Sequence, residues 1–328
     1  MRPIRTEDDL YDLTRAAAAV ATVAGWSKLG LFHLLADGAP RRLDELPADP
    51  RALRVTVPVL AHLGLLARDG DTIALTATAQ RLHAEGALGL YTTLDTLDDL
   101  SRIDEVIAKG GPARTRDGQS KATEGGVREE DVPRARGFME MLYRRSETSA
   151  RETARAIAKR LPAGAHVLDV GGGHGRYGRE LVELGLRATL FDKSVCVDFA
   201  REKHGEALGY LAGDFFRDDL GGPYDAALLS NIVHGFSIEE NRRLIARLAK
   251  VLKPGGHLVF KDMFLDDFAA HPENAVTFGL TMLFYTNGGQ SYTVAEMDAL
   301  CRAQGFAPVE TANFEDYALL FARKGGES

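Results

Sequence analysis

The chain has 328 residues, of which 45% are hydrophobic and 27% are charged, as is ordinary for a well-cored globular protein with two domains or one enlarged domain. A formal net charge of −7 disfavours binding to nucleic acid or to anionic membrane surfaces. The first residues are highly charged and lack the apolar block of a signal peptide, and the apolar run 16–24 is too short to span a bilayer, so we expect a cytoplasmic protein. Cys196 and Cys301 offer no pairing framework and are predicted to be reduced core residues.

The first part of the chain predicts helices followed by a small hairpin. Apolar residues recur at helical spacing over 10–35, interrupted at Gly25 and Gly30, and again over 51–66. The turn at 69–70, an Asp-Gly pair, then separates two short strand-like runs. This order of elements is typical of a winged helix.

Winged helices often bind DNA, and the helix expected over 51–66 would be the one that enters the groove. Apart from Arg51 and Arg54 its residues are apolar, whereas a helix that reads a DNA groove needs several polar and basic side chains. The pattern therefore favours a dimerisation or substrate-covering module over a DNA-binding one.

The second part of the chain predicts a sheet. A polar linker at 117–131 precedes a helix expected over 133–160, and strands then alternate with helix-length segments. The strand-like runs are His166–Val170, Ala188–Phe191, Tyr210–Ala212, Ala226–Leu229, His257–Phe260, Pro308–Thr311 and Ala318–Phe321. Helices between the first five indicate parallel βαβ units, while the short connection between the last two indicates an antiparallel hairpin. We predict an α/β, Rossmann-like, doubly wound sheet.

A glycine turn follows the first of these strands. In residues 169–175, Asp-Val-Gly-Gly-Gly-His-Gly, the glycines allow a sharp turn and close approach to a ligand. Residues 173–178 also satisfy the dinucleotide fingerprint, so a nicotinamide cofactor is the alternative, whereas no P-loop sequence follows. Asp169 argues against a nicotinamide cofactor, because a carboxylate at this position would repel the pyrophosphate. The same carboxylate would suit a ligand that carries an ammonium and a sulfonium.

Two further acids follow the next two strands. Asp192 is spaced to accept hydrogen bonds from ribose hydroxyls. Asp214 could accept from an adenine amino group while Phe215 offers its face to the ring. Three acids at successive strand ends therefore favour a nucleoside with a cationic tail, S-adenosylmethionine (SAM).

The chain resembles the winged-helix O-methyltransferase family, which includes plant phenolic and bacterial natural-product methyltransferases. The resemblance rests on Gly30-Leu31-Phe32, residues 53–66, Phe138, Met141 and Ser146, the run 168–173, Asp192, residues 213–216, residues 229–234 and the Lys-Pro-Gly-Gly of 253–256. It implies a class I methyltransferase with SAM bound at Gly171, Gly173, Gly175, Ser146 and Ser230, no metal, and a homodimer formed through the N-terminal helices.

On this resemblance we expect three parts. Residues 1–95 would form a winged-helix dimerisation domain, residues 96–160 linker helices that contribute to the substrate pocket, and residues 161–328 the SAM-binding catalytic domain.

The resemblance also implies the catalytic residues. His234 stands where the family carries its general base, and an imidazole beside the cofactor suits removal of a phenol proton near neutral pH. Asp262, at the end of the fifth strand, could hold the imidazole in its productive tautomer. The sequence departs from the pattern in lacking the Asp after the histidine and in carrying Ser291 where many relatives have a second acid.

The expected substrate pocket is aromatic and sulfur-rich, which suits a flat apolar molecule. Its candidate residues are Phe138, Met141, Leu142, Asn231, Met282, Phe284, Tyr285 and Tyr292.

The sequence therefore predicts transfer of a methyl group to a small, aromatic or polyketide-like molecule, with oxygen as the favoured acceptor. Methylation at carbon or nitrogen, and a non-methylating reaction that uses bound SAM, stay open, because the departures at Gly235 and Ser291 weaken the argument for a general base. A transcription regulator and a dehydrogenase are the alternatives from other classes.

Overall fold

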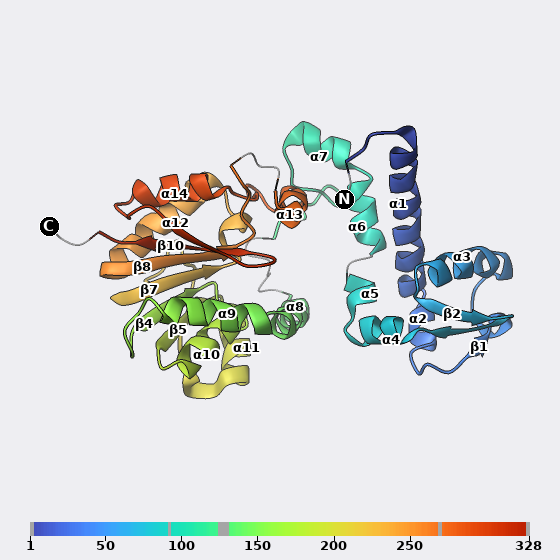
Figure 1. Ribbon diagram of the computed structural model, residues 1–328, viewed down its shortest axis with the longest axis horizontal. Helices are drawn as coiled ribbons and strands as arrows, with labels where there is room; N and C mark the ends of the chain where they lie inside the picture. The colour runs from blue at the N-terminus through green and yellow to red at the C-terminus, as the bar shows by residue number, and fades with distance from the viewer. Residues whose placement is uncertain (1–2, 91–92, 124–130, 268–270, 326–328) are drawn as a thin grey trace. The chain divides into compact units, whose positions relative to one another are not determined.

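The computed structural model describes residues 3–90, 93–123, 131–267 and 271–325. The chain folds into two compact units, Met1–Glu105 and Val106–Ser328, and each is taken by itself below (Figure 1). Among the described residues, no helix is both long enough and apolar enough to cross a membrane.

The first unit begins with a long helix, α1 (Glu7–Lys28), which opens on a capping box between Thr6 and Asp9. Gly30, at φ 70°, ends this stretch and starts the short α2 (Leu31–Leu34). The predicted interruption at Gly30 is confirmed, whereas the one at Gly25 is wrong, because α1 continues through that residue.

A three-stranded sheet completes the winged-helix arrangement of this unit. Helix α3 (Pro50–His62) precedes β2 (Leu66–Asp69) and β3 (Thr72–Leu75), which pair antiparallel across the predicted Asp-Gly turn, and β1 (Arg41–Arg42) pairs with β3. The core of the unit contains Trp26, Phe32, Leu53, Leu60 and Ile73. The remaining elements are η1 (Leu43–Glu45), α4 (Ala77–Ala84), α5 (Ala87–Leu90), α6 (Leu94–Leu100) and α7 (Ile103–Lys109), the last of which spans the division between the units.

The second unit is built on a seven-stranded sheet with the strand order β6-β5-β4-β7-β8-β10-β9. Its strands are β4 (His166–Val170), β5 (Arg187–Asp192), β6 (Gly209–Ala212), β7 (Tyr224–Ser230), β8 (Leu252–Asp262), β9 (Glu310–Asn313) and β10 (Ala318–Arg323). Neighbouring strands from β6 to β8 are parallel, and β10 is antiparallel to both β8 and β9. The predicted doubly wound sheet with a terminal hairpin is confirmed.

Two predicted strand boundaries were wrong. The strand expected over 308–311 begins at Glu310 instead, because the N–H of Val309 is bonded to the Asp298 carboxylate rather than to a neighbouring strand. Strand β8 starts at Leu252, so the glycine run expected to precede the strand lies within it, at a register shift opposite Tyr224.

Helices cover both faces of this sheet (Figure 1). Helices α9 (Glu147–Ala158) and α10 (Arg176–Glu183) pack on one face through a core that includes Ala154, Leu181 and Val259. Helices α12 (Ile238–Val251) and α14 (Val294–Arg302) pack on the other face through Leu244, Met297 and their neighbours, with Cys301 buried among them. Helix α11 (Ser194–His204) follows β5, and Cys196 within it is buried and forms no disulfide among the described residues.

The helix expected over 133–160 is broken in two. Helix α8 (Val132–Arg145) ends at Ser146, where α9 begins, and α8 packs on α11 through Ala135 and Met139. Helix α13 (Glu273–Tyr285) lies in the insertion after β8, and two backbone bonds tie its last turn to the segment 113–123. The carboxyl ends of the parallel strands thus meet α8, α13 and the glycine turn.

Candidate active site

The glycine turn follows β4 directly. Gly171, Gly173 and Gly175 have φ values of 66°, 51° and 72°, which only glycine adopts without strain. A Cβ on Gly173 would lie 3.1 Å from the Met139 sulfur, so α8 packs closely over the turn. The N–H of Gly173 donates to the Asp192 carboxylate at 2.8 Å, which fixes the turn to the end of β5.

Asp169 lies beneath this turn. Its side chain has no exposed surface, and a Cβ on Gly172 would lie 2.6 Å from one of its carboxylate oxygens. Burial raises the pKa of Asp169 to about 7, the charge of Asp192 adds to this, and the N–H of Gly178 opposes it. The sequence predicts direct contact between this carboxylate and a ligand cation. The structure does not fit that contact, because Asp169 is fully buried under the turn.

Asp192 and Asp214 stand at the ends of β5 and of β6, as the sequence predicts for a nucleoside site. Asp192 accepts from the N–H of Lys193 at 2.7 Å as well as from Gly173. Asp214 is exposed and accepts from the N–H of Phe216 at 2.8 Å. The Phe215 ring packs against Phe216, with centroids 4.9 Å apart.

Arg247, on α12, holds the loop that carries Asp214 and Phe215. Its Nε donates to the Phe215 carbonyl at 2.9 Å, and its guanidinium also donates to the Asp218 carbonyl. The Asp218 carboxylate in turn accepts from the N–H of Asp214 at 2.7 Å. Arg247 is thus a positioning residue for both predicted adenine-binding groups.

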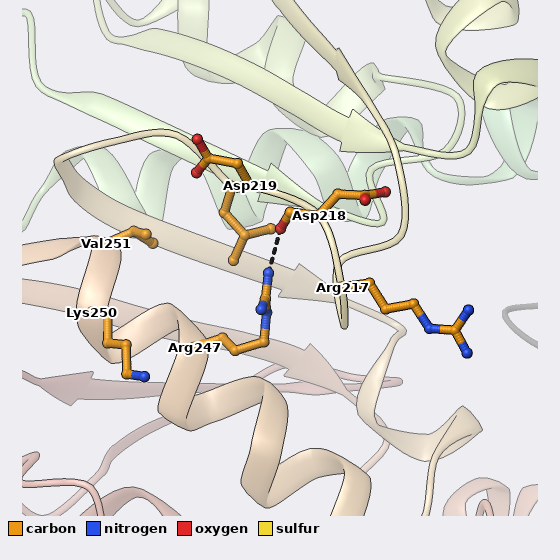
Figure 2. A pocket seen from close by; sticks show the side chains of 7 residues that line it. Arg217, Asp218, Asp219, Arg247, Lys250 and Val251 are labelled. Atoms are coloured by element: carbon orange, nitrogen blue, oxygen red, sulfur yellow. Dashed lines mark hydrogen bonds between the residues drawn. The ribbon is translucent and has the colours of Figure 1, made fainter.

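Arg247 also lines a surface pocket of about 340 Å³ beside this loop. Figure 2 shows the Arg247 side chain reaching the Asp218 backbone, whereas Arg217 points away from it. None of the predicted cofactor or catalytic residues lines this pocket, so it is a hollow behind the loop and not the site itself.

Two serines were expected at the cofactor site. Ser146 is buried at the junction of α8 and α9, where its hydroxyl donates to the Tyr143 carbonyl at 3.2 Å. Ser230 ends β7, and its buried hydroxyl has no hydrogen-bond partner among the described residues. An unpaired buried hydroxyl costs about 1–3 kcal/mol, so this atom fits a position that a ligand completes.

These residues fit SAM. Four of the five residues of the turn at 171–175 are glycines, which lets a ligand approach the carboxyl end of β4 closely. Asp192 and Asp214 offer carboxylates at the next two strand ends, Phe215 offers a ring, and Ser230 offers a hydroxyl that has no partner among the described residues.

His234 and Asp262 form a dyad at the ends of β7 and β8. The Nδ1 atom of His234, in the short helix η4 (Val233–Gly235), lies 2.8 and 2.9 Å from the two carboxylate oxygens of Asp262. Asp262 is 2% exposed and His234 is 16% exposed, so the acid is buried behind an accessible imidazole. This contact directs Nε2, the other ring nitrogen, away from the acid.

The electrostatics of this pair favour an ionised acid. Burial raises the pKa of Asp262, but the charge and hydrogen bond of His234, the N–H of Met263 and the charge of Lys261 outweigh it and hold the pKa below its ordinary value. An ionised Asp262 accepts from Nδ1–H and leaves Nε2 as the proton acceptor. Ser291 does not enter the dyad, because its hydroxyl donates to the Ala275 carbonyl at 2.6 Å.

The expected substrate residues fall into separate groups. Met282, Phe284 and Tyr285 lie on α13, which packs against η4 beside His234. Phe138, Met141 and Leu142 lie on α8, where Leu142 packs towards α11 and Phe138 is 36% exposed. Asn231 is exposed at the end of β7, with φ 57°. Tyr292 is buried in the core and donates to the Phe236 carbonyl at 2.5 Å, which favours a structural role.

Sequence reasoning missed Phe278, Arg247 and Lys261. The Phe278 ring meets the His234 imidazole edge-on, with centroids 4.7 Å apart, and it lies in the insertion that the sequence indicated for the pocket. Arg247 carries no sequence signal, because one charged residue on an amphipathic helix predicts only an exposed face. The signal for Lys261 was available, since a lysine at the end of an apolar strand is uncommon.

This fold and this site together define a SAM-dependent methyltransferase. The chain belongs to the O-methyltransferase domain family, whose model matches residues 115–307.

Two relatives from Streptomyces match nearly the whole chain. The 3-hydroxy-5-methyl-1-naphthoate 3-O-methyltransferase of Streptomyces sahachiroi is 28% identical over 325 residues, which cover 93% of this chain and 91% of the relative. The tetracenomycin polyketide synthesis 8-O-methyl transferase of Streptomyces glaucescens is 28% identical over 326 residues, which cover 94% of each chain.

Solved structures share the fold. The crystal structure of human N-acetylserotonin methyltransferase in complex with SAM has a TM-score of 0.72 and 20% identity, with 99% of this chain and 100% of that chain covered. The fold described above is therefore shared with a methyltransferase of known structure.

Proposed function

We propose that this enzyme methylates a hydroxyl group of a small aromatic or polyketide-like natural product, with His234 as the general base. The single observation that carries the proposal is the contact of His234 Nδ1 with the buried Asp262 carboxylate at 2.8 Å. The proposal is also supported by the relatives, which are named as a naphthoate and a tetracenomycin O-methyltransferase.

The chain's own residues would act on the proton and on the geometry. Bound SAM supplies an electrophilic methyl group on a sulfonium. The substrate hydroxyl would lose its proton to Nε2 of His234 as its oxygen takes the methyl group, and S-adenosylhomocysteine would be the other product. Asp262 would stabilise the resulting imidazolium, and holding the reactants in line would contribute most of the rate.

The proposed substrate site would begin beside the dyad. Phe278 meets the imidazole edge-on, and Met282 and Tyr285 follow on the same helix. Aromatic and thioether groups at this position would favour a flat ring over a flexible aliphatic alcohol. Phe138 and Met141 on α8 are further candidates, together with Asn231.

We further propose a homodimer formed through the N-terminal part, residues 1–95, in the cytoplasm. Support comes from α1, on which Leu10, Tyr11, Leu13 and Val20 are 53%, 60%, 45% and 38% exposed. Apolar surface of this kind on one helix is typical of a protein interface. Residues 96–160 and 161–328 would then contribute pocket helices and the catalytic domain.

The test is methyl transfer from SAM with a deuterated methyl group to a panel of hydroxynaphthoates, polycyclic phenols and matched aliphatic alcohols. We expect the deuterated methyl on an oxygen of at least one phenol, identified by mass spectrometry and NMR, and no product from the alcohols. Transfer only to carbon or nitrogen would contradict the proposed acceptor, and binding of neither SAM nor S-adenosylhomocysteine in calorimetry would contradict the cofactor.

A further inference from the structure

Lys261 is a buried lysine near the end of β8. Lys261 is 8% exposed, its ammonium donates to the Asn231 side-chain oxygen at 3.0 Å, and it lies 4.5 Å from the centroid of the Tyr317 ring. No carboxylate in the part of the chain that the structure describes forms an ion pair with it. Burial of a cation without an anion costs several kcal/mol, so a further negative group beside Lys261 would stabilise its charge.

The nearest acids are committed elsewhere. Asp262, the next residue, faces the opposite side of the sheet and pairs with His234. Glu152 accepts from the Tyr317 hydroxyl at 2.9 Å, so the tyrosine ring stands between this acid and the lysine.

The register of the sheet gives Lys261 a polar neighbour. Lys261 is the cross-strand partner of Ser230. By the alternation of side chains along a strand, both residues lie on the same face of the sheet as Leu228 and Val259, which pack beneath α9 and α10. Ser230 is the residue whose buried hydroxyl has no partner among those described. An ammonium that forms no ion pair and a hydroxyl that has no partner, both counted among the described residues, thus lie on adjacent strands at the same level of the sheet.

The charge of Lys261 also affects His174, a residue of the glycine turn. Burial above all, with the charges of Arg176, His204 and Lys261, lowers the pKa of His174 in that turn to about 3. His174 is therefore neutral near pH 7, and Arg176 pairs with Glu147 at 3.8 Å. Of the two permanent cations that act on His174, Arg176 pairs with an acid, whereas Lys261 forms no ion pair within the described part of the chain.

We propose that Lys261 binds the carboxylate at the amino-acid end of SAM, with the Ser230 hydroxyl as a second donor. By alternation with Val259, Lys261 lies on the α9 and α10 face of the sheet at the end of β8, where β7 separates it from the strand that carries the glycine turn, whereas the dyad faces the α12 side. The inference rests on the cofactor assignment and adds the residue that recognises the charged tail of the cofactor.

The test compares two ligands that differ only in this carboxylate. S-adenosylhomocysteine and its decarboxylated analogue are titrated by calorimetry into the wild type, Lys261→Met, Lys261→Arg and, as a matched control, Lys253→Met. Lys253 lies at the other end of the same strand, where it pairs with Asp225 at 2.7 Å. Circular dichroism and thermal melting establish that each variant is folded.

In the wild type we expect loss of the carboxylate to weaken binding by roughly 10–100-fold, the range of a buried charge-assisted hydrogen bond. In Lys261→Met the two ligands should bind with nearly equal affinity, while Lys261→Arg and Lys253→Met should keep most of the difference. The ratio of the two affinities is decisive, because a lysine with a purely structural role would weaken both ligands alike.

Two results would overturn the proposal. One is a wild-type enzyme that binds both ligands equally, and the other is a Lys261→Met variant that keeps the wild-type ratio, as it would if the lysine served the methyl acceptor. If Lys261→Met does not fold, Lys261→Gln is measured in the same way and decides by the same ratio. Failure of the wild type to bind either ligand would instead contradict the cofactor assignment.

Discussion

His234 and Asp262 show how two strand ends create a reactive pair from residues 28 positions apart. Strands β7 and β8 are parallel neighbours, so the chain that leaves each of them emerges at the same edge of the sheet. The sequence predicted both residues and their contact from a resemblance. It could not predict that Ser291, the position of the missing acid, would be tied to the α13 backbone, because that depends on how the insertion folds.

Replacement of Asp262 by Asn should remove the negative charge beside the imidazole, and with it the preference for Nδ1–H, while keeping the shape of the side chain. We expect kcat to fall by roughly 10²–10⁴-fold, because the imidazole then loses both its fixed tautomer and the stabilisation of its charged form. Steady-state kinetics gives kcat, and calorimetry with S-adenosylhomocysteine should give an unchanged affinity. A variant with near wild-type turnover would mean that this acid serves stability alone.

Ionisation of Asp169 should lower the free energy of unfolding of the unliganded protein in a pH-dependent way. Its pKa is raised from 3.8 to about 7 in the folded state, so folding favours the protonated form. This destabilisation is absent below about pH 4 and grows as the pH rises towards about 7. Above about pH 7 it is constant, at a few kcal/mol. Asp169→Asn removes this ionisation, so the difference in melting temperature, variant minus wild type, should rise between pH 4 and pH 8. A difference that is independent of pH would contradict the raised pKa.

At the scale of elements, periodicity predicted most strands but misplaced some boundaries. The parallel strands β4, β5, β7 and β8 contain short apolar runs, as burial on both faces requires, whereas β6, at the edge of the sheet, is only partly buried. The break between α8 and α9 was missed, because Ser146 and the residues around it continue the helical spacing. Only packing of α8 on α11 and of α9 on the sheet separates the two helices, and such tertiary contacts leave no local signal.

The loop after β6 should depend on Arg247. Arg247→Ala removes the bonds to the Phe215 and Asp218 carbonyls, which should loosen the predicted adenine-binding loop and raise the dissociation constant of S-adenosylhomocysteine about tenfold. The matched control is Lys250→Ala, which lines the same pocket and should bind normally. Arg247→Lys should recover part of the affinity. Equal affinities for Arg247→Ala and the control would show that the loop holds its shape without this anchor.

At the scale of the molecule, composition and element order predicted a helical unit with a small hairpin followed by a Rossmann-like unit. The structure has two such units, with the division at Glu105 and Val106. The sequence could not predict α13 and its ties to the segment 113–123, because they depend on pairings between distant segments with no repeated pattern.

The proposed dimer should depend on the apolar surface of α1. Leu13→Glu and Val20→Glu place charges on exposed positions of a helix whose own core contacts are made by Val23, Ala24 and Trp26. We expect sedimentation velocity to give a dimer for the wild type and a monomer for the double variant, with unchanged helix content by circular dichroism. As a control, Arg54→Glu on α3 should leave the dimer intact. A monomeric wild type at micromolar concentration would contradict the proposal.

The central claim is that His234 removes the acceptor's proton during methyl transfer, and single-turnover kinetics of His234→Ala tests it most directly. With saturating SAM and a phenol that the wild type methylates, the account predicts a rate lower by roughly 10²–10⁴-fold, an unchanged affinity for S-adenosylhomocysteine, and partial recovery on addition of imidazole. The recovered rate should rise with the concentration of neutral imidazole. A variant that transfers the methyl group at the wild-type rate, without imidazole, would contradict it.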